Sequence, residues 1–141
     1  MTTLNEARNA IYKLYKTNQS DFTLGTTLAL DGSVDFDEPT TDWARLSVLH
    51  SVAFQETLGT SGNRKFERHG NAILQIFTPA NEQGHVSRAD TYAQNAQAIF
   101  EGESIDGTTI YFTDVNVREN GVTDNWYNIV VDASFVYHIT K

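Results

Sequence analysis

Four histidines are the side chains of this chain best suited to bind a metal or to transfer protons: His50, His69, His85 and His138. No two of them lie three or four residues apart, so none forms the pair that binds a metal on one helix face. The chain has no cysteine, which excludes disulfides and thiolate metal ligands. We therefore expect no metal site and interpret the histidines as ordinary surface or half-buried side chains.

An acidic segment at residues 34–39 carries alternating carboxylates at Asp35 and Asp37, followed by Glu38. Alternating carboxylates can bind calcium, but the glycine and the terminal glutamate of an EF-hand loop are missing. A solvated acidic loop is the alternative, and we favour it. The chain also lacks the Gly-x-Ser-x-Gly motif of hydrolases and the Gly-Lys-Ser/Thr motif of phosphate-binding loops. We expect no catalytic residues and no cofactor.

Arg64, Lys65, Arg68 and His69 form a basic cluster in a chain that is acidic overall, with 10 lysines and arginines, 18 acidic residues and a net charge of −8. The cluster could contact an acidic partner surface, or it could be a solvated hairpin tip. If a neighbouring copy supplies the acidic surface, we expect Asp35 and Asp37 to be its partners. That contact would be head-to-tail, the kind that closes a ring.

Length and composition favour one folded domain over residues 1–141, since 40% of the residues are hydrophobic and 20% are charged. An acidic chain of this kind is a poor general binder of nucleic acid. No apolar stretch approaches the roughly 20 residues that span a bilayer. The first residues show no basic region followed by an apolar run, so we expect no signal peptide and a cytoplasmic location by default.

Two amphipathic helices are predicted, over residues 3–18 and 86–100, because apolar residues recur there at three- and four-residue steps. The first begins with a capping box, in which Thr3 and Glu6 bind each other's backbone amides. Strands are predicted at residues 26–30, 42–52, 71–78, 108–118 and 125–140. Pro79 ends the third strand, and Asn120-Gly121 predicts the turn between the last two.

The order of helix, strands, helix and strands predicts an α+β fold: a mainly antiparallel sheet with both helices packed on one face. Residues 54–69 lie between two strands and are glycine-rich and irregular, so we interpret them as a long, mobile hairpin arm. The last strand alternates clearly, and its outward face includes Trp126, Val130 and Val136. Such an apolar outward face indicates either a partner contact or packing under a loop.

Four segments spread over nearly the whole chain carry a resemblance to a known family. They are residues 34–36 with 43–46 (Val-Asp-Phe, then Trp-Ala-Arg-Leu); Arg64, Arg68 and Gly70 before residues 72–79 (Ala-Ile-Leu-Gln-Ile-Phe-Thr-Pro); Gly84, Ala89, Ala93 and Phe100; and residues 126–129 through 135–137 (Trp-Tyr-Asn-Ile, then Phe-Val-Tyr). In this order they resemble the tail terminator, or tail completion, proteins of bacteriophages with long non-contractile tails.

The resemblance implies a structural virion protein that forms a homo-hexameric ring on the last ring of the tail tube. Such a ring stops tube polymerisation and presents the surface that joins the head. The implied partners are other copies of the chain, the major tail-tube protein and the head connector or neck protein, with no sequence-specific nucleic acid and no membrane. The implied location is the virion tail, after assembly in the host cytoplasm.

For contacts between subunits or with the tube, the resemblance and the charge pattern together point to eight residues. These are Trp43, Arg45, Arg64, Lys65, Phe66, Arg68, Asp35 and Asp37.

Two other functions remain open. Ala44 stands where the family usually has a larger β-branched residue, which leaves room for a head-completion or neck protein of similar fold. A different class is a small α+β enzyme or ligand-binding domain, which would need a pocket with converging polar groups. His50, Asp114 and Asp132, all on predicted strands, are the candidates for such a pocket.

Overall fold

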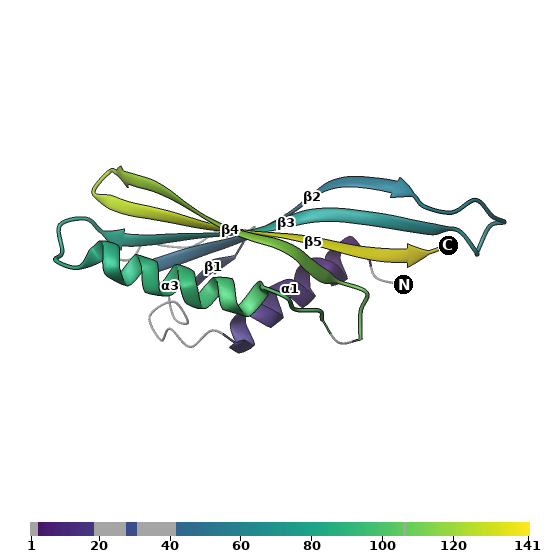
Figure 1. The fold of residues 1–141 in the computed structure, drawn as a ribbon, viewed down its shortest axis with the longest axis horizontal. Helices are drawn as coiled ribbons and strands as arrows, with labels where there is room; N and C mark the ends of the chain where they lie inside the picture. Colours follow the sequence, from purple (N-terminus) through teal and green to yellow (C-terminus); the bar gives the residue numbers. More distant parts are fainter. Residues whose placement is uncertain (1–2, 19–27, 31–41, 106) are drawn as a thin grey trace.

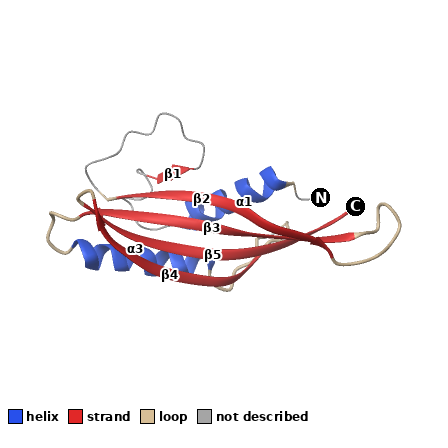
Figure 2. Cartoon of the chain, turned by 90° about the horizontal axis from the view of Figure 1, so that it is seen from above, coloured by secondary structure: helices blue, strands red, loops and turns tan. Residues whose placement is uncertain are grey.

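The computed structural model describes residues 3–18, 28–30, 42–105 and 107–141. Its main layer is a twisted five-stranded sheet in the order β1-β2-β3-β5-β4, and two helices cover one face of it (Figures 1 and 2). The elements are α1 (Leu4–Asn18), β1 (Leu28–Leu30), β2 (Trp43–Gln55), β3 (Lys65–Pro79), α3 (His85–Phe100), β4 (Tyr111–Thr123) and β5 (Trp126–Thr140). The predicted α+β fold is confirmed.

Strand pairing is antiparallel except at one edge, where the short β1 runs parallel to the start of β2. β3 and β5 pair over their whole lengths, from Lys65 opposite Thr140 to Pro79 opposite Trp126. This long central pair is flanked by β2 on one side and β4 on the other. The sheet therefore has two distant ends, one at the loop between β2 and β3 and the other at the β4–β5 hairpin (Figure 2).

The N-terminus of α1 has the predicted capping box. The Thr3 backbone amide donates to Glu6 Oε2 at 2.8 Å, and the Glu6 amide donates to Thr3 Oγ1 at 3.1 Å. These bonds satisfy two donors that a helix start leaves without intrahelical partners. The bond from the Thr3 amide lowers the pKa of the Glu6 carboxyl group. Of the predicted apolar stripe, Leu4 is the exception, since it stays 54% exposed.

The hydrophobic core lies between the helices and one face of the sheet. Small residues of α3 (Ala89, Ala93 and Ala96) are buried and let this helix lie close to the strands. Larger rings fill the space between the helices and the sheet: Tyr15 stacks on Phe100 with ring centroids 5.9 Å apart. Each large apolar side chain buried in this way contributes about 1.5–3 kcal/mol to the free energy of unfolding.

A buried ionic network joins the start of β2 to α3. Asp42 is 6% exposed; it accepts a hydrogen bond from the Tyr92 hydroxyl at 2.7 Å and another from Arg88 Nε at 3.1 Å. Arg88 also binds Glu82 Oε2 at 2.9 Å. Because a buried carboxylate is costly unless it is paired and hydrogen-bonded, the network fixes this end of β2 against the helix.

The turn between β4 and β5 differs from the prediction. Asp124 and Asn125 form it, with φ values of 51° and 69°, and β4 continues past Asn120-Gly121. Two-residue hairpin turns need positive φ at their central residues, and Asp and Asn tolerate this region well. Gly121, with φ of 80°, instead accommodates a register shift between β4 and β5. The Asn-Gly pair therefore marks a β-bulge rather than the turn.

A second bulge decides which β4 side chains face the core. The register with β5 shifts between Phe112 and Asp114. This shift returns Val115 to the helix-covered face, where it packs against the core, although simple alternation places it on the opposite side.

Among the described helices, none is long and apolar enough to cross a membrane.

Candidate functional site

The arm between β2 and β3 is more regular than predicted. β2 continues to Gln55 and β3 begins at Lys65, so only residues 56–64 form a loop (Figure 1). The pairing shifts between His50 and Ala53, and this bulge bends β2 as it enters the arm. Strand pairing, rather than the irregular composition, thus decides the arm's structure. It projects beyond the helix layer (Figure 1).

Four exposed apolar side chains lie along the end of β2 and in the loop that follows it. Leu49 is 51% exposed, Val52 56%, Phe54 47% and Leu58 96%. We call these four residues the arm patch. The β2 edge beside them pairs with no other strand in the described part of the chain. Several exposed apolar side chains next to an open strand edge are typical of an interaction surface.

The predicted basic cluster is divided between surfaces. Lys65 points to the face without helices and binds Glu56 at 3.3 Å. Arg64 Nε donates to the Gly59 carbonyl at 2.9 Å and so closes the arm loop. Arg68 lies on the helix side, with its guanidinium 5.9 Å from the Phe66 ring centroid. Because side chains alternate along a strand, Lys65 and Arg68 point to opposite faces once β3 begins at Lys65. The interpretation of residues 54–69 as an irregular arm did not predict this separation.

Arg68 contributes to a cationic hollow beneath the arm. The hollow has a volume of about 310 Å³, and its lining includes Leu4, His50 and Arg68. His50 Nε2 lies 3.0 Å from the Tyr137 hydroxyl. Burial, then the charges of Arg8 and Arg68, lower the pKa of His50. An acidic group from a partner would meet the positive charge of Arg68 here.

We expect the His50 environment to make stability depend on pH. The unfolded chain binds a proton at His50 near pH 6.5, whereas the folded chain binds it only at lower pH. The unfolded state thus holds more protons in that interval, so the free energy of unfolding falls as pH drops below about 6.5. Urea unfolding measures the free energy of unfolding at pH 7.5 and at pH 5.0. Between these pH values, we expect it to fall less for His50→Gln than for the wild type; an equal fall in both would contradict this.

An aromatic cluster occupies the opposite end of the sheet, on the face without helices. The Trp43 and Phe77 rings stack with centroids 4.2 Å apart, and Trp126 meets Trp43 edge-on at 6.3 Å. The Arg45 guanidinium lies 5.6 Å from the Trp43 centroid. A hollow of about 410 Å³, which Asn120 and Thr123 also line, opens beside these rings. The predicted contact residues therefore form two groups, one at each end of the sheet.

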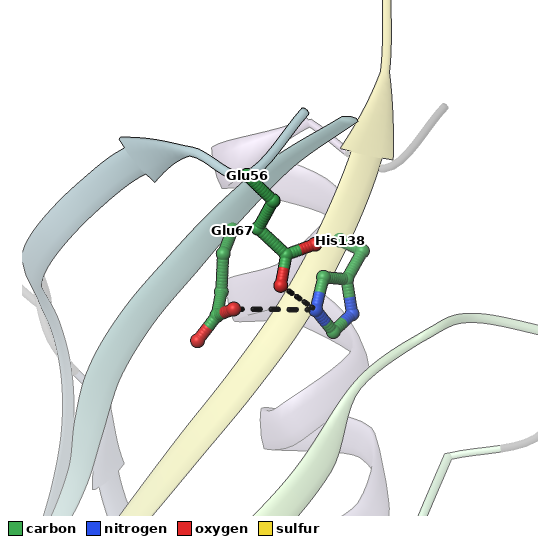
Figure 3. Close-up of side chains that lie close together, drawn as sticks. All are labelled: Glu56, Glu67 and His138. Carbon is green, nitrogen blue, oxygen red and sulfur yellow. Dashed lines mark ion pairs between the residues drawn. The ribbon is translucent and has the colours of Figure 1, made fainter. Parts of the chain in front are cut away.

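A third group, which the sequence analysis missed, lies at the base of the arm. Glu56 Oε1 and Glu67 Oε2 are 3.5 Å and 3.6 Å from His138 Nε2 (Figure 3). Glu67 and His138 are direct cross-strand partners. The histidine spacing considered in the sequence applies to ligands on one helix. It cannot predict a group of residues that comes from β2, β3 and β5. Alternation could have placed Glu67, His69 and His138 on one face, but not beside each other without the register.

The three residues proposed for a small-molecule pocket do not converge. His50 points to the helix-covered side, where its ring meets Phe135 edge-on. Asp132 lies on the other face and accepts a hydrogen bond from Asn71 at 2.7 Å. Asp114 pairs with Ser134 at the neighbouring step of that face. Asp35 and Asp37, the predicted acidic partners of the basic cluster, lie outside the described residues.

Comparison with known proteins gives a likeness of fold. No family model matches the chain, and neither does any curated protein. One solved structure, whose name carries no functional description, is similar with a TM-score of 0.66 and 13% sequence identity. That match covers 95% of this chain and 97% of the other. At this identity the likeness establishes a shared fold over nearly the full length.

Proposed function

We propose that this chain is a tail terminator of a long-tailed, non-contractile bacteriophage. It would assemble as a homo-hexameric ring on the end of the tail tube, stop tube polymerisation and present the surface for head joining. The sequence resemblance gives the family, and the arm patch is the structural observation that best supports assembly. Assembly that buries these apolar side chains and pairs the open strand edge would be favoured in free energy over the monomer.

The two surfaces of a head-to-tail contact can be assigned within this proposal. One is the arm patch, and the other is a different part of the neighbouring copy, because a ring needs two complementary surfaces. The cationic hollow suits an acidic segment because Arg68 lines it with a positive charge. Asp35 and Asp37 are the proposed source of that acidity, in a chain whose net charge is −8. Arg64 and Lys65 contribute less, because Arg64 closes the loop and Lys65 is paired.

The other end of the sheet is the proposed contact for the tail tube or the head connector. The exposed Arg45 lies there beside the largely buried Trp43 ring, far from the arm, so a ring built through the arm leaves this end of the sheet accessible to a second partner. Aromatic and arginine side chains are frequent at the energetic centres of interfaces. Phe66 is a weaker candidate, since it packs partly against the core.

The test is the mass of the free chain, followed by its binding to purified tail tubes. Light scattering coupled to size exclusion, at low and high protein concentration, should give a ring-sized species or a shift toward one. If the chain is monomeric throughout, electron microscopy should show it capping tube ends. A chain that neither assembles nor caps tubes is not a terminator. Binding to the head connector but not to the tube would identify a neck protein of similar fold.

A further inference from the structure

The cluster at the base of the arm has the donor set and the spacing of a metal site. Glu56 and Glu67 each offer a carboxylate oxygen and His138 offers Nε2, and these three atoms all lie within 4.8 Å of one another. Nitrogen and carboxylate ligands at about 2.0–2.2 Å from a tetrahedral zinc ion lie roughly 3.3–3.6 Å apart. The observed separations from His138 Nε2, 3.5 Å and 3.6 Å, fall in that range.

The backbone holds the three side chains in place. Glu67 and His138 face each other across β3 and β5. Glu56 follows β2 directly, and its amide donates to the Lys65 carbonyl at 2.8 Å, which continues the β2–β3 pairing by one residue. Figure 3 shows both carboxylates directed at the His138 ring. A site built on paired strands requires little rearrangement when an ion binds.

Neighbouring rings and a second histidine complete the surroundings. The Tyr111 ring stacks on His138 with centroids 6.2 Å apart, and the Phe54 ring stacks on His69 at 5.3 Å. His69 Nε2 binds Glu67 Oε1, the oxygen that faces away from His138. A partner of this kind orients the carboxylate, as is usual around metal ligands.

The local charge also favours a cation. The two carboxylates have one lysine beside them. Lys65 Nζ binds Glu56 Oε2 at 3.3 Å, and Glu56 Oε1 remains directed at His138. With His138 neutral, as it must be to bind a metal, the group carries a net charge of −1. The three side chains are 17–26% exposed, so a hydrated ion can reach them and keep a water as fourth ligand.

We propose that Glu56, Glu67 and His138 bind one zinc-class divalent ion, with His69 as a positioning residue. The ion would join the end of β2 to β3 and β5 and so tether the arm. This inference concerns a single chain and is independent of the proposed ring.

The experiment is a calorimetric titration of ZnCl₂ into the full, tag-free chain after chelator treatment, at pH 7.5. We expect one ion per chain. His138→Gln should reduce affinity by more than about 100-fold, and His69→Gln by about 10- to 100-fold, the range for residues that orient a ligand. His85→Gln is the matched control, because His85 lies at the start of α3 and binds the Glu82 carbonyl; its affinity should be unchanged.

Two further readouts make the result unambiguous. Co²⁺ in place of Zn²⁺ should give the visible absorption of a four-coordinate centre in the wild type and lose it in His138→Gln. Amide exchange in residues 56–64 should slow when Zn²⁺ is added. Circular dichroism confirms that each variant is folded. The proposal is wrong if binding does not saturate at one ion, or if His138→Gln binds as tightly as His85→Gln.

Discussion

Replacing Gly70 by alanine is expected to lower the free energy of unfolding by about 3 kcal/mol, the upper part of the range for an overpacked core. Gly70 is buried in β3, where β2 and β5 flank it. A Cβ atom at this position would lie 2.4 Å from the Leu49 carbonyl oxygen and 2.5 Å from the Phe135 ring. Real Cβ atoms essentially never approach other atoms so closely.

Neither neighbour of Gly70 can move easily. The Leu49 carbonyl belongs to the paired backbone of β2, and Phe135 is fully buried in β5. The substitution must therefore distort the sheet where the arm begins. Gly59→Ala is the matched control, because a Cβ there has only ordinary contact, 3.4 Å from the Asn63 carbonyl oxygen. Urea unfolding at pH 7.5 compares the two; equal stability of both variants would show that the strands adjust freely.

The sequence predicted most of the fold because its apolar periodicities are strong. β5 alternates without interruption in sequence, and its unbroken register with β3 puts its two sets of side chains on opposite faces as expected. Val130 and Val136 of the outward set are nevertheless buried. The capping box of α1 is a local motif that depends only on neighbouring residues, and both of its hydrogen bonds form. Local signals of this kind hold wherever long-range packing does not oppose them.

Features set by long-range pairing could not be predicted. Asn120-Gly121 is a local turn signal, yet in the structure Gly121 lies at a bulge in the pairing of β4 with β5. The turn is formed instead by Asp124 and Asn125. Val115 changes face for the same kind of reason. Each bulge adds one residue to a strand, and a one-residue shift moves every later side chain to the other face.

The candidate sites show the same limit more strongly. Arg64, Lys65 and Arg68 are close in sequence but serve different surfaces, whereas Glu56 and His138 are 82 positions apart and meet at one place. Contacts between side chains on different strands depend on register, which sequence periodicity does not specify.

Within the proposed ring, Val52→Asp combined with Leu58→Asp is expected to abolish assembly. The two side chains are 56% and 96% exposed in the single chain. If a neighbouring copy buries both, each contributes about 1.5–3 kcal/mol to the contact. Aspartate at these positions would lose this hydrophobic contribution to the contact. It would also add the free-energy cost of removing a carboxylate from water. Since 1.4 kcal/mol is a tenfold change in an equilibrium constant, each contact should weaken by at least about 100-fold.

The structure offers a matched control for this pair. Val122 is 60% exposed on β4, at the end of the sheet away from the arm, so Val122→Asp matches the Val52→Asp half of the pair in charge and exposure. Neither variant should change the unfolding free energy by more than about 0.5 kcal/mol, since all three positions are on the surface. Light scattering of the free chain, which does not involve the tube contact proposed at the Val122 end of the sheet, should then show assembly for Val122→Asp only. If the arm variant assembles at the same protein concentrations as the wild type, the arm patch is not part of the subunit contact. Two carboxylates buried in every interface of the ring would weaken assembly measurably.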